Sequence, residues 1–125
     1  MQTRSYTVIV MEADEKRFAI YVEPNIGRAI QMELTEIEKP RPLTHDLVSM
    51  IFNGLNIKLK HIVITDLVDT VYYARLFVEQ VIEDKTHILE IDARPSDCIT
   101  LAIMNNTPVY CTANVLEKTV LIDDI

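Results

Sequence analysis

Glycine is scarce in this chain: only Gly27 and Gly54 occur among its 125 residues. A loop that cradles a nucleotide phosphate with backbone N–H groups needs several closely spaced glycines, so the sequence excludes a site of that kind. Cysteine is equally rare, and Cys98 and Cys111 form neither a CxxC motif nor a metal-finger spacing. We therefore expect two reduced, buried thiols in a cytoplasmic protein.

Long apolar runs and excess positive charge are also missing. No 18 apolar residues stand together, which predicts that the chain does not cross a membrane. With 12 basic and 19 acidic side chains the net charge is −7, so the chain repels nucleic acid at long range. Contact with phosphate then requires a local basic cluster or a bound metal ion. Hydrophobic residues nevertheless reach 49%, which favours a homo-oligomer that covers part of the apolar surface.

Periodicity predicts an α+β fold of one compact domain over residues 1–125, with a mainly antiparallel sheet and about three helices. Asn25 and Thr44 are expected to cap the first two helices, and Gly54 to end the second. The predicted helices cover about 25–39, 44–54 and 95–105. Strands are expected at 6–11, 17–23, 59–68, 71–82, 86–93 and 107–112, with an edge segment at 116–125.

Two Arg–Pro motifs, "RPLTHD" and "DARPSD", precede the second and third predicted helices. Pro is tolerated at the first position of a helix, and the helix dipole favours Asp46 and Asp97 in the first turn. The same dipole disfavours a cation, so Arg41 and Arg94 need carboxylate or phosphate partners. The repeated motif also hints at an internal duplication.

Two interpretations of these motifs stay open. In the first, the arginines and aspartates are structural ion pairs that hold the helix starts on the sheet. In the second, they form a phosphodiester site that uses Mg²⁺ or Mn²⁺. Its catalytic residues are then His45, Asp46, Asp92 and Asp97, with the three aspartates as metal ligands. Arg41, Arg94 and Ser96 bind the substrate, although the Ser96 hydroxyl also suits a helix start.

The segments "RPLTHDL", "IDARPSDCITLAI" and "PVYCTANVL" resemble the bifunctional nuclease family, whose members degrade both DNA and RNA. Softer similarity extends over residues 5 to 122. The resemblance implies a compact α+β domain, homo-oligomers and a nuclease activity directed at phosphodiesters. Where the family usually has Ala after the second Asp, this chain has Cys98. The family motif maps onto Arg41, Pro42, Thr44, His45 and Asp46, and onto Asp92, Arg94, Pro95, Ser96 and Asp97.

We therefore expect a cytoplasmic nuclease that hydrolyses DNA and RNA and has no contact with a membrane. The main alternative is a non-catalytic homo-oligomeric regulatory module in which the same charges are structural. A weaker alternative is a binding protein for an anionic metabolite. A nuclease requires the two motifs to lie side by side in a wet cleft, whereas the module predicts that they are buried and fully paired.

Overall fold

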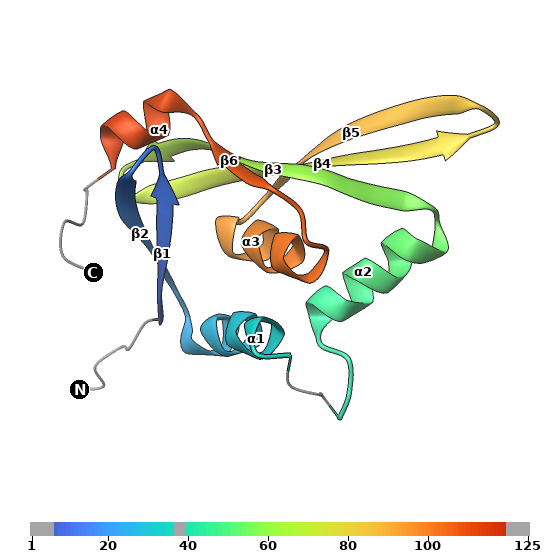
Figure 1. Cartoon of the computed structure of the whole chain (residues 1–125), viewed down its shortest axis with the longest axis horizontal. Coiled ribbons are helices and arrows are strands. Elements are labelled where there is room, and N and C mark those ends of the chain that lie inside the picture. Colours follow the sequence, from blue (N-terminus) through green and yellow to red (C-terminus); the bar gives the residue numbers. More distant parts are fainter. Residues whose placement is uncertain (1–6, 37–39, 120–125) are drawn as a thin grey trace.

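The computed structural model describes residues 7–36 and 40–119, which form two sheets and four helices. In chain order the elements are β1 (Thr7–Ala13), β2 (Lys16–Val22), α1 (Pro24–Leu34), α2 (Thr44–Gly54), β3 (Ile57–Val68), β4 (Val71–Ile82), β5 (Lys85–Ala93), α3 (Pro95–Met104), β6 (Val109–Cys111) and α4 (Ala113–Lys118). Figure 1 shows α1, α2 and α3 on one side of the larger sheet.

The larger sheet has the strand order β5-β4-β3-β6. Its first three strands are antiparallel, and β6 runs parallel to β3. Alternation along β3 and β4 places Ile62, Ile64, Ala74, Leu76 and Val78 on one buried face. The hydrophobic core packs against that face of the sheet. The predicted α+β class and mainly antiparallel sheet are confirmed.

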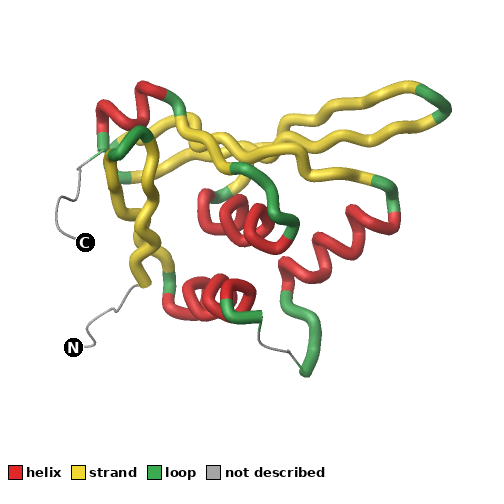
Figure 2. Tube along the Cα trace, viewed as in Figure 1, coloured by secondary structure: helices red, strands yellow, loops and turns green. Residues whose placement is uncertain are grey.

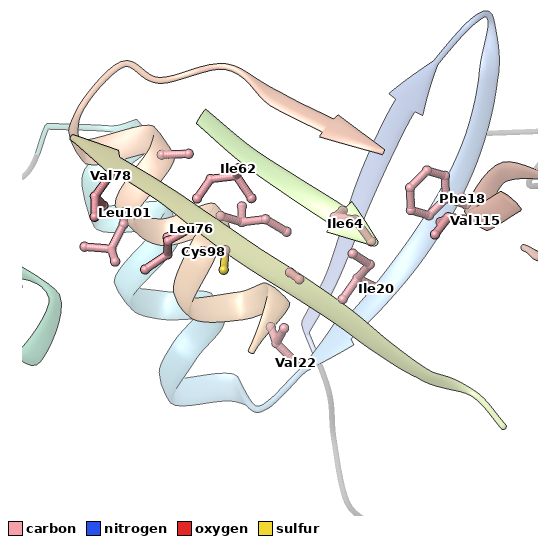
Figure 3. Packing of buried hydrophobic residues seen from close by; sticks show 13 residues of the cluster. Phe18, Ile20, Val22, Ile62, Ile64, Leu76, Val78, Cys98, Leu101 and Val115 are labelled. Carbon is pink, nitrogen blue, oxygen red and sulfur yellow. The ribbon is translucent and has the colours of Figure 1, made fainter. Parts of the chain in front are cut away.

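Helix α3 is the centre of this core because it is apolar nearly all round. Its residues Cys98, Ile99, Leu101 and Ala102 are all buried. The helix contacts β3 and β4 on one side and α1 on the other, so sheet, α3 and α1 form three successive layers (Figure 1). Figure 3 shows the cluster between α3 and the sheet, which the β1–β2 hairpin closes with Phe18 and neighbouring apolar residues. The start of α3 is therefore held rigidly.

The hairpin turns are built without glycine. Both central residues have positive φ in the turns Asp14–Glu15, Asp69–Thr70 and Glu83–Asp84, as a two-residue type I′ turn requires. Asp and Glu are tolerated there more readily than a β-branched residue, so Thr70, with φ 69°, is strained. The turn predicted near Asp69 and Thr70 is confirmed.

The helix ends differ from the predicted caps. Asn25 lies inside α1, because Pro24 takes the first helical position and Glu23 precedes it. Thr44 is likewise the first residue of α2 and not its cap. Gly54 is the last residue of α2, and the left-handed conformation falls on Asn56, with φ 56°. Pro fixes a helical φ in advance, which moves the start of α1 one residue earlier.

The C-terminal edge segment was a wrong prediction for residues 116–118, which belong to α4. The Thr112 hydroxyl accepts a hydrogen bond from the Val115 N–H (3.2 Å) and caps this short helix. Residues 120–125 of the predicted segment lie outside the described residues. The hint of an internal duplication stays a prediction. Within the described residues, none of the helices is long and apolar enough to cross a membrane.

The tip of the β4–β5 hairpin, residues 81–86, extends past the end of β3 as a two-stranded arm (Figure 2). Val81 and Ile82 are exposed apolar side chains of this arm, and Ile88 and Leu89 are exposed next to it, where β3 still pairs with β4. At the base of the arm, the Gln80 side-chain amide donates to the Leu55 carbonyl (2.7 Å), which ties the arm to the end of α2. An isolated two-stranded ribbon is marginally stable in water, so this arm is suited to contact with another surface.

Candidate functional site

The starts of α2 and α3 lie side by side and are joined by one hydrogen bond. His45 Nε2 is 2.9 Å from Asp97 Oδ1, although 52 residues separate the two in sequence. His45 is buried, with 8% of its surface exposed. An ionised carboxylate can only accept, so the imidazole donates. The structure therefore brings the two Arg–Pro motifs together, as a shared site requires.

Arg94 completes this cluster from the residue before α3. Its Nε donates to Asp97 Oδ2 (2.8 Å) and its Nη2 donates to Asp97 Oδ1 (3.1 Å), a bidentate fork. Burial opposes ionisation of Asp97, yet hydrogen bonds from Arg94 and His45 hold the pKa of Asp97 below its ordinary value. The Arg94 side chain remains 68% exposed, so its guanidinium is fixed at the surface.

Asp46 has a different partner. Its Oδ2 accepts the backbone N–H of Leu43 at 2.6 Å, the residue that precedes α2. This bond satisfies an N–H at the helix start. Asp46 therefore supports the turn that carries His45.

Asp92 lies away from the core on β5. Its neighbours Ile91 and Ala93 pack against the core, so alternation points Asp92 to the opposite face of the sheet. On β4 it is opposite Arg75, whose guanidinium pairs with Glu90 at 2.7 Å. The positive charge of Arg75 is thus paired with Glu90.

The three aspartates predicted as metal ligands do not converge. Both oxygens of Asp97 are bound by His45 and Arg94, one oxygen of Asp46 caps α2, and Asp92 faces the other side of the sheet. Within residues 7–36 and 40–119, no group of three or more His, Cys, Asp or Glu side chains is placed to hold a metal ion. The side chains that the structure describes do not fit a three-carboxylate Mg²⁺ or Mn²⁺ site.

A surface cleft of about 370 Å³ opens beside Arg94. Its walls come from the end of β2, the first residues of α1, the β3–β4 turn and the start of α3. The residues that line it are Ile20, Tyr21, Val22, Glu23, Ile26, Thr70, Val71, Tyr72, Arg94, Pro95 and Ser96. The first N–H groups of a helix have no partner within the helix, and its dipole favours an anion. Arg94 and the α3 start therefore give the cleft an anion-binding end.

Arg41, His45 and Asp97 do not line this cleft. Arg41 is exposed in the segment before α2 and does not line the cleft. His45 lines a narrow space between α1, α2 and α3. The hydrogen bonds from His45 to Asp97 and from Arg94 to Asp97 connect His45 to the cleft. These three residues form one chain of groups, with a buried end at His45 and an exposed end at Arg94.

Sequence patterns missed the tyrosines of the cleft. Tyr21 and Tyr72 belong to strands that are distant in sequence, and neither lies near an Arg–Pro motif. Alternation predicts that the adjacent Tyr72 and Tyr73 point to opposite faces, one of them inward, but it does not predict that Tyr72 lines a cleft. Cys98 is fully buried, and burial, followed by the charges of Asp97 and Asp92, raises the pKa of its thiol to about 12, which disfavours the reactive thiolate.

Comparison with known proteins identifies the family. The bifunctional nuclease domain family matches residues 8–123, nearly the whole chain. Two Mycobacterium tuberculosis relatives, "Uncharacterized protein MT1877" of strain CDC 1551 / Oshkosh and "Uncharacterized protein Rv1829" of strain ATCC 25618 / H37Rv, are each 32% identical over 112 residues. The match covers 89% of this chain and 64% of each relative, so the chain spans about two-thirds of their length. On this evidence, the chain belongs to the bifunctional nuclease domain family.

Proposed function

We propose that this protein hydrolyses phosphodiester bonds of DNA and RNA in the cleft beside Arg94. The observation that carries the proposal is the exposed Arg94 fork, which Asp97 holds at 2.8 and 3.1 Å at the mouth of the cleft. A fixed guanidinium is suited to a phosphate because it presents paired donors with little further loss of conformational freedom. Membership of the bifunctional nuclease domain family supports the same conclusion.

The substrate phosphate binds at the start of α3. Arg94 and the N–H end of α3, beside Ser96, stabilise the negative charge that develops on the phosphoryl oxygens. Arg41 is proposed to hold a neighbouring phosphate of the strand, since it is exposed before the adjoining helix. These contacts supply the local positive charge that a chain of net charge −7 otherwise lacks.

His45 and Asp97 form the proposed acid–base pair. Water attacks phosphorus, the bond to the leaving oxygen breaks, and the proton lost by water is returned to that oxygen. The lowered pKa of Asp97 keeps its carboxylate ionised at neutral pH, so that Asp97 holds Arg94 and orients His45, the proposed proton carrier. The 2.9 Å bond from His45 stabilises the pair. Asp46 takes part indirectly, by fixing the first turn of α2, which carries His45. The predicted catalytic role of Asp92 is tested by the substitution Asp92→Asn.

A requirement for Mg²⁺ or Mn²⁺ remains a prediction. The described side chains do not form a three-carboxylate site, so no step above is routed through a metal. The assay therefore compares reactions with either ion and with a chelator.

The test is cleavage of single-stranded DNA and RNA by wild type, Asp97→Asn, His45→Ala and Asp92→Asn, each first checked for folding by circular dichroism. We expect wild type to cleave, Asp97→Asn and His45→Ala to lose about tenfold or more, and Asp92→Asn to lose less. Equal residual cleavage in all four proteins would point to a contaminant and contradict the proposal.

A homo-oligomeric interaction module is the second candidate function. Exposed apolar side chains on α2 and just after it favour this function: Leu47, Met50 and Ile51 on the helix, and Leu55 at its C-cap. This surface adjoins the base of the projecting arm through the Gln80–Leu55 hydrogen bond. We propose that a second copy of the chain covers it, which sedimentation velocity tests directly. The two free cysteines, Cys98 and Cys111, support a cytoplasmic location.

A further inference from the structure

We propose that the cleft beside Arg94 binds one unpaired nucleobase, so that the protein selects single-stranded over double-stranded nucleic acid. This inference rests on the proposed function and names its substrate class. Arg94 holds the phosphate at one end of the cleft, and the apolar and aromatic wall receives the attached base.

The size and lining of the cleft suit a single nucleotide. Its volume of about 370 Å³ lies near the lower end of the range of about 300–1,000 Å³ that small-molecule sites occupy. Val22, Ile26 and Val71 supply apolar wall, whereas Glu23 and Ser96 supply polar groups near Arg94. A flat base with a polar edge matches this combination, while an intact duplex is too wide to enter.

Tyr72 forms a rigid aromatic part of the wall. Its ring stacks on the buried ring of Phe18, with centroids 5.9 Å apart and an interplanar angle of 24°. A tyrosine phenol is neutral at physiological pH, and burial raises the pKa of the Tyr72 phenol further. A neutral ring held in place loses little freedom when a base packs against it.

Tyr21 adds an aromatic side chain at the rim. It lines the same cleft and is 66% exposed, between two buried neighbours on β2. Stacking of one base on an aromatic side chain is worth about 1–3 kcal/mol and tolerates every base, because each has a π-face. The site therefore accepts DNA and RNA without strong sequence preference.

In a duplex, base pairing and stacking prevent a base from entering such a cleft. Moving one base out of a duplex costs a few kcal/mol, whereas a base of a single strand is already accessible. Because the net charge of −7 weakens non-specific backbone binding, the cleft has to supply much of the affinity. Single strands should consequently bind more tightly than duplexes of the same sequence.

The test measures binding without turnover, by fluorescence anisotropy of labelled DNA in a buffer with chelator. The probes are a single strand, its duplex and a single strand of abasic sites. The proteins are wild type, Tyr21→Ala and Tyr73→Ala. Tyr73→Ala is the control, because Tyr73 is also exposed (46%) but does not line the cleft. We expect the duplex and the abasic strand to bind at least fivefold more weakly. Tyr21→Ala should weaken binding of the normal strand about five- to tenfold, and Tyr73→Ala should leave it unchanged.

Two results would overturn the inference: equal binding of single strand and duplex, or equal effects of Tyr21→Ala and Tyr73→Ala. Absence of all binding would overturn it as well. Failure of the proposed nuclease function would give a different result. If the expected binding pattern appears but no phosphodiester is cleaved with or without metal, the base-binding cleft stands and the nuclease activity does not. If cleavage occurs without strand preference, only the base-binding cleft is lost.

Discussion

The starts of α2 and α3 carry the same residue at the same position but use it differently. Asp46 and Asp97 are each the third residue of their helix. Asp46 accepts a backbone N–H from Leu43 within its own helix start. Asp97 binds the Arg94 guanidinium and reaches across to His45 of the other helix. One aspartate is thus a local cap, and the other joins two helices.

The number of residues between the arginine and the aspartate explains why the two aspartates have different partners. In "RPSD" the aspartate follows the arginine by three residues, so Arg94 and Asp97 face each other across the first turn of α3. In "RPLTHD" the separation is five residues, and Leu43, which has no polar side chain, precedes the helix. Pro95 is the first residue of α3, whereas Pro42 lies before Leu43. Two similar motifs therefore produce one helix cap and one charged cluster.

The largest expected effect comes from Asp97→Asn. This change removes the negative charge that three donors share, so the free energy of unfolding should fall by about 2–3 kcal/mol at neutral pH. Urea denaturation measures the loss. Asp92→Asn is the matched control, since Asp92 is exposed, and should change stability by less than about 0.5 kcal/mol. Equal losses in the two variants would contradict the role assigned to Asp97.

The same pair of proteins predicts a pH dependence. The pKa of Asp97 is lowered by folding, so its contribution is complete above the unfolded value of about 3.9. As pH falls below about 4 toward the folded pKa, the carboxylate protonates and the contribution disappears. The stability difference between wild type and Asp97→Asn should therefore be constant from about pH 5 to 7 and shrink below about pH 4. A difference that grew in acid would oppose this account.

A smaller loss is expected for Asp46→Ala. Removing the acceptor of the Leu43 N–H should cost about 1 kcal/mol, the usual effect of losing a helix cap. Thermal and urea unfolding would measure it, and cleavage should fall less than in Asp97→Asn. If Asp46→Ala destabilised the protein more than Asp97→Asn, the contrast between the two helix starts would be reversed.

The smallest effect is expected near the start of α3, where the strained Thr70 lines the cleft. Thr70→Gly should stabilise the protein by about 0.5–1 kcal/mol, because glycine adopts positive φ without steric cost. Glu15→Gly is the control, since Glu15 has a similar φ of 64° but no branched Cβ. The free energy of unfolding should rise less in Glu15→Gly than in Thr70→Gly. A larger gain at Glu15 would show that strain at Thr70 is not the cause.

Much of the fold was predictable from local patterns. Strand β4 was predicted with its observed bounds, because apolar and polar residues alternate along it and the Asp69–Thr70 turn marks its start. The apolar pattern after Pro95 likewise predicted α3. The caps were less predictable, since Pro24 competes with Asn25 for the start of α1. Short α4 has too few residues for its periodicity to be distinguished from a strand.

The candidate site was predictable only in part. The sequence identified Arg94, Asp97 and His45, whose contact depends on the packing of α2 against α3. Alternation along β5 would have placed Asp92 on the face opposite Ile91 and Ala93, but the shared motif "DARPSD" favoured grouping Asp92 with Asp97. The sequence could not place Tyr21 in the cleft, since that requires β2 and the β3–β4 turn to meet in space.

The most direct test compares cleavage of a single-stranded oligonucleotide by Arg94→Lys and Arg75→Lys. Both arginines are exposed and paired with a carboxylate, but only Arg94 lines the cleft. Lysine keeps the charge and loses the bidentate fork. We predict that Arg94→Lys lowers the cleavage rate by about tenfold or more, while Arg75→Lys stays close to wild type. Equal rates for the two variants would contradict a phosphodiester site at the start of α3.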